Sequence, residues 1–528
     1  MLTKHHLKLQ RFLRSIALLF FASLAIATQA AQLRIGLGAD VTSIDPHQIN
    51  IAPNNAVDWH IFEALTHVDA DTRLVPGLAT SWRAIDGTTW EFKLRRGVKF
   101  HDGADFTAED VAFSIDRATE LGAKGGQFAN FVKPIVSKQI LDPYTIRFKT
   151  ATPYAILPYD LNSIYIVSRK SAAGASTEDF NSGKAAIGTG PFKLATFRRG
   201  DRVELVRNEN YWADKPAWQK VTLRILPSDP ARTAALLAGD VDAIENIPTA
   251  DTARIKANAN FRLEQKVSWR TIFFHLDQYR DHPPGVTDKN GKTLAKNPFR
   301  DVRVREALAL AINRQAIVER AMEGFAVAAG NIVAPPVFGH NATVKPAAYD
   351  PDAAKKLLAA AGYPDGFSIV LAAPNNRYVN DDQVAQVVAQ MLARVGITVS
   401  RVETHPAASY FTKARNGDFA FAMLGWGSFG ADLALRTLVA TSNAEKGYGT
   451  WTWGRYSNPR VDQLVEQALA SVDPARREAA AREAMGIAMK DYALIPVHHQ
   501  IASWAMKKGL AYTPRTDEFT FAQHFRPQ

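Results

Sequence analysis

Residues 75–117 read VPGLATSWRAIDGTTWEFKLRRGVKFHDGADFTAEDVAFSIDR, and the turn and alternation signals in this stretch decide the fold. Pro76-Gly77 predicts a turn before the first strand. Trp90, Phe92 and Leu94 then alternate with polar residues, which predicts a strand with one buried face. Because Arg96-Gly97 reverses the chain before the alternation resumes, the centre of the stretch predicts a β-hairpin.

The end of the same stretch predicts a helix. His101-Asp102-Gly103 is a second turn signal, and Thr107 is a typical N-cap residue. Asp110 stands three positions after Thr107, where a capping box places its acidic partner. A hairpin that leads into an amphipathic helix indicates an α/β architecture.

These residues also carry a resemblance to a known family. PGLA-x-SW, W-x-F-x-L-R-x-GVKFHDG and FTAEDV-x-FS follow one another almost without gaps. In this order they resemble the signature of the family 5 solute-binding proteins of ABC importers, the dipeptide, oligopeptide and nickel type. The resemblance implies a two-lobed periplasmic binding protein fold of type II, in its large three-domain variety, with a hinge and an inserted small α/β domain.

Other segments extend the resemblance over residues 32–528. GTGPFKL at 188–194 is similar to the return of the chain into the first lobe, and residues 62–65 are expected on a helix. Residues 301–322 place Val304, Leu308 and Ile312 at helical spacing, which predicts one long amphipathic helix.

The length of 528 residues also predicts more than one lobe, because a single hydrophobic core stops growing at roughly 250–300 residues. The resemblance divides the chain into a signal peptide, a first lobe, an inserted domain and a second lobe. Their expected limits are 1–30 for the signal peptide, 31–62, 187–272 and 496–528 for lobe I, 63–186 for the inserted domain II, and 273–495 for lobe II, or domain III.

The first 30 residues predict a secretory signal peptide. Four basic residues precede an apolar run from Ile16 to Ala27, and Thr28-Gln29-Ala30 provides small residues for cleavage near Ala30. The apolar run is shorter than the ~20 residues of a membrane-spanning helix. The sequence contains no cysteine, so no thiol at the cleavage site could carry a lipid. We therefore expect a periplasmic protein without a lipid anchor.

The charge balance argues against a nucleic-acid partner. The formal net charge is +11, of which the signal peptide contributes four and the mature chain seven. Lys and Arg are scattered among Asp and Glu without a run of five, which indicates a mixed solvated surface rather than a basic binding face.

The sequence holds no convincing catalytic motif. Gly291-Lys292-Thr293 lacks the upstream glycine of a phosphate loop, because position 286 is Val286. Trp426 stands where a nucleophile elbow around Ser428 needs glycine. No HExxH occurs, and the adjacent His498 and His499 would face opposite sides of a strand. We expect no enzyme activity, no metal site and no cofactor, with a secreted hydrolase on a similar scaffold as the alternative.

The resemblance implies three regions that line the ligand cleft. The first is the loop after the opening strand, with Asn50, Ile51 and Asn54. The second contains Arg377 and Tyr378, where peptide-binding relatives place an arginine on the ligand carboxylate. The planar fork of arginine suits that contact.

The third region contains Trp426, Phe429 and Asp432. Relatives have a Gly-Trp here, followed three residues later by an aspartate that pairs with the α-amine of a peptide. This chain has Trp426, but Phe429 occupies the position of the acid. Either Asp432 replaces the acid, or the ligand is not an ordinary peptide and Asp432 caps the helix that follows.

The function implied by the resemblance is capture of one solute between two lobes and its delivery to an inner-membrane ABC permease with its ATPase subunits. We expect a small peptide, or a peptide-like or other organic carboxylate solute, bound by a monomeric protein. Opines, sugar conjugates and nickel chelates remain open as ligands, as does a chemoreceptor-coupling or chaperone role.

Overall fold

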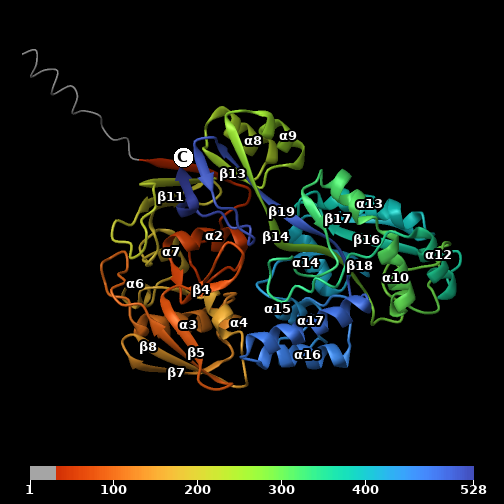
Figure 1. The fold of residues 1–528 in the computed structure, drawn as a ribbon, viewed down its shortest axis with the longest axis horizontal. Helices are drawn as coiled ribbons and strands as arrows, with labels where there is room; N and C mark the ends of the chain where they lie inside the picture. Colours follow the sequence, from red (N-terminus) through yellow and green to blue (C-terminus); the bar gives the residue numbers. More distant parts are fainter. Residues whose placement is uncertain (1–30) are drawn as a thin grey trace, which may run out of the picture.

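The computed structural model describes residues 31–528, and the predicted signal peptide lies outside this range. One 11-stranded sheet runs through both lobes of the molecule (Figure 1). Its strands lie in the order β10 (Phe192–Arg198), β11 (Arg202–Arg207), β12 (Lys220–Ile225), β1 (Gln32–Leu37), β13 (Ala243–Glu245), β19 (Ile495–Lys507), β14 (Phe261–Leu276), β18 (Phe421–Trp426), β16 (Ser368–Pro374) and β17 (Thr398–His405), and β15 (Ala326–Ala328) pairs with β19.

Strands β14 and β19 are the two segments that cross between the lobes. They pair antiparallel; β19 also pairs with β13 in lobe I, and β14 pairs with β18 in lobe II. The register of the β14–β19 pair shifts between Val267 and Thr271. A break of this kind redirects side chains. Residues 268–270 lie in it, and the backbone N–H of Trp269 donates to the carbonyl of Thr516 at 2.9 Å.

Lobe I and the inserted unit share one hydrophobic core. The inserted unit has its own four-stranded sheet. The helix predicted at the end of residues 75–117 is present, but the hairpin predicted around Arg96-Gly97 is wrong. Residues 89–94 pair with residues 79–84 before them and with the distant residues 145–150, and residues 98–100 form no strand of this sheet. The helices of lobe I are α2 (Ala52–Ile61), α8 (Asp229–Ala238) and α9 (Thr249–Ala257). The inserted unit contains β5 (Ala79–Ala84), β6 (Thr89–Leu94), β8 (Thr145–Thr150) and β7 (Ile135–Asp142), with α3 (Ala108–Gly122), α4 (Ala129–Val132), α5 (Leu157–Asp160), α6 (Arg169–Ala172) and α7 (Thr177–Asn181).

The capping box predicted for α3 is confirmed. Thr107 is the N-cap, and the Asp110 carboxylate accepts the backbone N–H of Thr107 at 3.0 Å. The helix expected at residues 62–65 is wrong, because α2 ends at Ile61 and β2 (Glu63–Ala64) pairs with β9 (Tyr165–Ile166).

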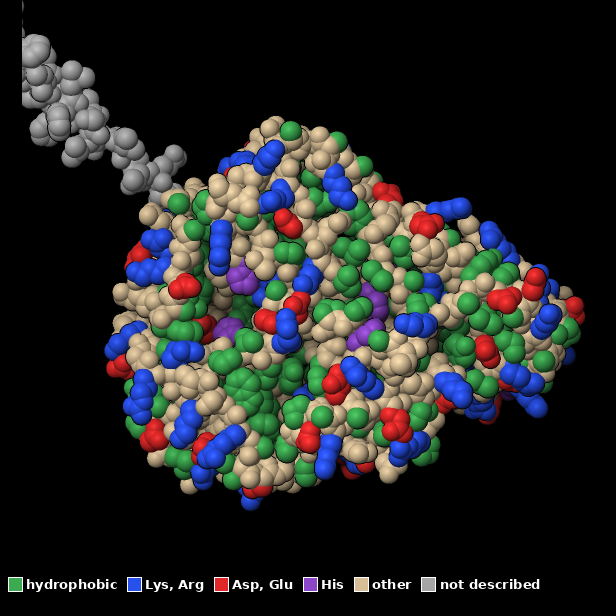
Figure 2. All heavy atoms as spheres, viewed as in Figure 1, with side chains coloured by type: hydrophobic (Ala, Val, Ile, Leu, Met, Phe, Trp, Pro, Cys, Tyr) green, Lys and Arg blue, Asp and Glu red, His purple; other side chains and the backbone are tan. Residues whose placement is uncertain are grey.

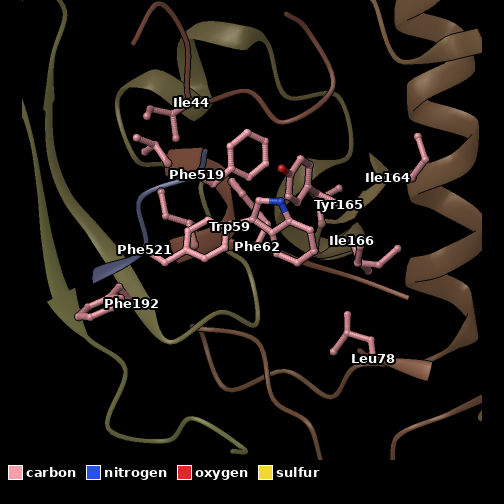
Figure 3. Close-up of a cluster of buried hydrophobic side chains, with 14 of the residues drawn as sticks. Ile44, Trp59, Phe62, Leu78, Ile164, Tyr165, Ile166, Phe192, Phe519 and Phe521 are labelled. Atoms are coloured by element: carbon pink, nitrogen blue, oxygen red, sulfur yellow. The ribbon is translucent and has the colours of Figure 1, made fainter. Parts of the chain in front are cut away.

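The last residues of the chain return to lobe I and complete its core. Figure 3 shows Phe519 and Phe521 packed beside Trp59 and Tyr165. Residues on either side of Glu518 are buried in this way, since Asp517 is 1% exposed and Phe519 is 8% exposed. Glu518 itself has a positive φ of 67° and remains partly exposed. The segment therefore holds the Glu518 carboxylate out of the core.

Lobe II consists of helices on both faces of β16, β17 and β18, with two main hydrophobic cores. Its helices are α10 (Val302–Ala311), α11 (Arg314–Ala316), α12 (Pro351–Ala360), α13 (Asp381–Ala393), α14 (Ala407–Asn416), α15 (Ala431–Leu438), α16 (Pro459–Ala470) and α17 (Pro474–Lys490). The single long helix expected over 301–322 is interrupted, because Ile312 is extended and Asn313 caps a new helix by accepting the N–H of Ala316.

The inserted unit also contacts lobe II directly, as α15–α17 lie beside it in Figure 1. The N–H of Ala155 donates to the carbonyl of Leu469 at 2.8 Å, and Ile156 belongs to a core of lobe II. The two lobes are thus joined by the crossover strands and by this second contact.

The surface mixes both signs of charge. On the face drawn in Figure 2, Lys and Arg side chains are interspersed with Asp and Glu. Within residues 31–528 no helix combines the length and the apolar character that crossing a membrane requires.

Candidate functional site

Six side chains from four segments meet where the lobes adjoin, and we call them the interlobe site. They are Trp269 and Arg270 of β14, Arg377 and Tyr378 after β16, Phe429 after β18, and Glu518 of the C-terminal segment. Two of the three regions predicted from the sequence contribute to the site.

The loop that carries Arg377 is fixed by the first residue of α13. The Asp381 carboxylate accepts the backbone N–H groups of Arg377 at 2.9 Å and Tyr378 at 3.0 Å. The Tyr378 hydroxyl donates to the carbonyl of Gly425 at 3.1 Å, which ties the loop to β18. The Arg377 guanidinium lies 5.2 Å from the centre of the Tyr378 ring, within cation–π range.

Arg377 is exposed to solvent but surrounded by protein. Desolvation is the main cause that lowers its pKa, followed by the charge of Arg270. Across residues 31–528 no carboxylate forms an ion pair with the Arg377 guanidinium. The site therefore presents an accessible cation without an acidic partner.

Arg270 does have such a partner. Its guanidinium binds the Glu518 carboxylate at 2.6 Å, and the Ser268 hydroxyl donates to the same carboxylate at 2.6 Å. Burial disfavours ionisation of Glu518, but the charge and hydrogen bonds of Arg270 outweigh it, and the pKa of Glu518 is lowered. Arg270 also lies 5.9 Å from the centre of the Tyr378 ring.

Trp269 and Phe429 form an aromatic part of the site, and Phe519 packs against it from the core of lobe I. The Trp269 ring meets the Phe429 ring edge-on at 4.9 Å and the Phe519 ring at 6.1 Å. Trp269 packs directly on the backbone of Gly427, where an added Cβ would lie 2.5 Å from the indole nitrogen. Gly427 is needed here because of this close approach.

Trp426 and Asp432 lie outside the group of six. Trp426 is half-buried and packs against Trp451 at 5.3 Å. Asp432 is 0% exposed, and its carboxylate accepts a 2.5 Å hydrogen bond from Arg477. The expectation that Asp432 could replace the missing acid does not fit this structure, because the side chain has no accessible surface. Asp432 lies in the first turn of α15, whose N-cap is Gly430.

The first predicted region is not a loop throughout. Helix α2 begins at Ala52, so Asn54 lies inside it, and the Asn54 amide oxygen accepts the N–H of Thr42 at 2.9 Å. Asn50 accepts a hydrogen bond from Asn55 at 2.7 Å, and Ile51 is 36% exposed. The Asn54 side chain therefore stabilises the backbone at Thr42. A contact of Asn50 or Ile51 with ligand remains a prediction.

Sequence reasoning missed Trp269, Arg270 and Glu518. Trp269-Arg270 interrupts a long strand with an aromatic and a charged residue, which could have marked the pair. Glu518 lies 248 positions from Arg270 along the chain, so no local pattern connects them.

A separate pocket of about 240 Å³ lies in lobe II and is lined by Arg314, Lys345 and Lys490 among others. Its buried Arg314 donates to the carbonyls of Pro496 and Ala309, so this arginine stabilises the backbone.

In the described range no three His, Cys, Asp or Glu side chains are grouped to hold a metal. Burial lowers the pKa of both His498 and His499 to about 3, which keeps them neutral.

Comparisons with known proteins agree on one family. Residues 73–445 match the family described as bacterial extracellular solute-binding proteins, family 5. The chain is 30% identical over 492 residues to the glutathione-binding protein GsiB of Escherichia coli O1:K1, with 91% of each chain covered.

Solved structures of similar proteins have the same fold. The periplasmic binding protein DppA of Helicobacter pylori, in complex with the peptide STSA, has a TM-score of 0.78 at 25% identity, over 95% of this chain and 99% of that one. The binding protein AgaA of A. tumefaciens R10, in complex with agropinic acid, has a TM-score of 0.75 at 25% identity, over 94% and 99%.

Proposed function

Since the chain belongs to family 5 of the bacterial extracellular solute-binding proteins, we propose that it captures a carboxylate-bearing, peptide-like small solute at the interlobe site. The fold is the two-lobed type II binding-protein fold, and the protein is the solute-binding component of an ABC importer. The proposal concerns which solute it binds and which residues hold it.

The observation that carries the proposal is the Arg377 guanidinium, which is accessible and has no acidic partner in the described chain. A guanidinium donates two parallel hydrogen bonds to a carboxylate. The loop that carries Arg377 is held by Asp381 and by Tyr378, so the backbone from which the side chain extends is fixed before ligand arrives. Preorganisation of this kind reduces the entropy lost on binding.

The aromatic side chains suit the remainder of such a solute. Trp269 and Phe429 offer apolar surface beside the charged groups, as is typical of small-molecule sites. Trp426 and Trp451 would extend this surface if the lobes close further over a longer ligand.

Relatives bind different small solutes, among them glutathione, a peptide and agropinic acid. A carboxylate is common to all three, and Arg377 fits that shared group. A hydrolase would need an accessible nucleophile paired with a base. Next to Arg270 the Thr271 hydroxyl meets His499 at 2.8 Å, but both of these residues are buried. We therefore propose a binding protein and keep a hydrolase as the alternative.

Family 5 binding proteins are periplasmic, and we propose the same location for this chain, with cleavage near Ala30 and no lipid anchor. The mature protein would deliver its solute as a monomer to an inner-membrane permease and its ATPase subunits.

A thermal-shift screen of mature protein against peptides, opines, sugar conjugates and nickel chelates tests the proposal. A ligand at a hundredfold excess over its Kd adds about 2.7 kcal/mol to the free energy of unfolding. We expect shifts with carboxylate-bearing solutes that disappear in Arg377→Ala. Equal shifts in the variant would refute the assigned role of Arg377.

A further inference from the structure

The carboxylates around the interlobe site are already engaged. Glu518 accepts hydrogen bonds from Ser268 and from two nitrogens of Arg270. Both oxygens of Asp381 accept backbone N–H groups, from Arg377, Tyr378 and Asp382, and its side chain is almost completely buried.

Asp432 is engaged more completely still. One oxygen accepts from Arg477 at 2.5 Å and the other from the N–H of Leu433 at 3.0 Å. It has no exposed surface. Of these three acids, Glu518 alone retains a partly exposed side chain, at 20%.

Several hydrogen-bond donors in the same place are not engaged. Arg377 donates only its backbone N–H, which leaves its guanidinium free in the described chain. Arg270 binds Glu518 through Nε and Nη2, so Nη1 is not needed for that pair. Among residues 31–528 the indole N–H of Trp269 finds no acceptor.

The charges agree with this imbalance of donors and acceptors. Of the three acids named above only Glu518 is partly exposed, whereas two guanidinium groups, those of Arg270 and Arg377, lie within 6 Å of the Tyr378 ring. An ammonium group would be repelled by Arg377 and would compete with Arg270 for Glu518. A carboxylate or carbonyl oxygen would meet an unused donor instead.

We propose that the site is specific for carboxylate solutes whose amino group is acylated or otherwise uncharged, such as N-acylated amino acids and peptides, over solutes with a free ammonium. This inference rests on the proposed function, because it assigns the chemistry of the same site. It follows from the unused donors of Arg377 and Arg270 and from the engaged state of Glu518, Asp381 and Asp432.

The test compares two probes that differ only at the amine, Ala-Phe and N-acetyl-Ala-Phe, by titration calorimetry on the mature protein. We expect the acetylated probe to bind at least tenfold more tightly. Tighter binding of Ala-Phe would overturn the inference. If Arg377→Ala bound both probes as tightly as wild type, that result would count against the proposed function instead.

A second arm covers the case in which neither probe binds. Solute released from the purified protein is treated with an amine-reactive reagent and weighed by mass spectrometry. A carboxylate solute that gains no label supports the inference, and a labelled solute overturns it.

A gain-of-function variant adds a third readout. Phe429→Asp places a carboxylate beside Trp269, whose ring lies 4.9 Å from that of Phe429, and Phe429→Leu is the matched apolar control. We expect only the aspartate variant to gain tenfold or more in affinity for Ala-Phe. If wild type and Phe429→Leu already bind Ala-Phe as tightly as Phe429→Asp, the site does not lack an amine acceptor and the inference fails.

Discussion

The Asp432 carboxylate lies 2.5 Å from Nε of Arg477, and both side chains are almost completely shielded from solvent. The guanidinium also lies over the rings of Tyr159 in the inserted unit and Phe338 in lobe II. The pair therefore helps to hold the inserted unit against lobe II, and it keeps the Asp432 carboxylate out of the interlobe site.

Asp432→Asn leaves the buried Arg477 without its counter-charge. From the sequence alone a slight loss of stability would be expected, as for a charge near a helix N-terminus. The buried pair raises the expected loss to about 3–5 kcal/mol in the free energy of unfolding, measured by urea titration. Replacing both residues, as in Asp432→Asn with Arg477→Met, should cost less than the single change. A loss below about 1 kcal/mol for the single change would mean that the pair is not formed.

Asp160 should give the protein a pH-dependent stability. Burial is the main cause that raises its pKa to about 6, and Tyr154, which is hydrogen-bonded to Arg436 of lobe II, donates to it at 2.5 Å. Because the folded-state pKa exceeds the unfolded value, the folded protein binds more protons between pH 4 and 6. Stability from this group is therefore present at low pH and is lost as pH rises to about 6.

Asp160→Asn removes that titration. From pH 4.5 to pH 7.5, the stability of the variant relative to wild type should improve by about 2 kcal/mol. Urea titrations at the two pH values measure the difference, and Asp352→Asn on the exposed face of α12 is the matched control. A relative stability that stays constant with pH would show that Asp160 titrates normally.

Gly427→Ala should disturb the interlobe site through Trp269. The added Cβ would lie 2.5 Å from the indole nitrogen, so the ring must move. Overpacking of this kind typically costs about 1–3 kcal/mol. We expect a lower melting temperature and weaker solute binding. Gly509→Ala, whose added Cβ meets nothing within 4 Å, should change neither, and equal behaviour of the two variants would contradict the close packing of Trp269.

Local signals predicted the capped helix correctly, but not the hairpin around Arg96-Gly97, whose strand finds its partners elsewhere in the chain. Thr107 and Asp110 stand three residues apart, and the capping box they form needs only each other and the backbone. The expectation for residues 62–65 failed because Glu63–Ala64 pairs with Tyr165–Ile166, about a hundred positions away, and a long-range partner overrides local propensity.

The site was predictable only in part for the same reason. Arg377 and Tyr378 lie in one loop that the family resemblance identifies. Arg270 and Glu518 meet only after the C-terminal segment has returned to lobe I, and Asp432 is withdrawn by Arg477, 45 positions away. Such pairings depend on the folded chain and leave no mark in a short stretch of sequence.

Native mass spectrometry of the mature protein, purified without denaturation, tests the central claim most directly. Wild type, Arg377→Ala and Arg394→Ala are compared, since Arg394 is an exposed arginine at the far end of α13, about 20 Å along the helix from the Arg377 loop. We predict that wild type and Arg394→Ala carry the same small carboxylate solute and that Arg377→Ala is empty but folded. An Arg377→Ala protein that carries that solute at wild-type occupancy would contradict the account.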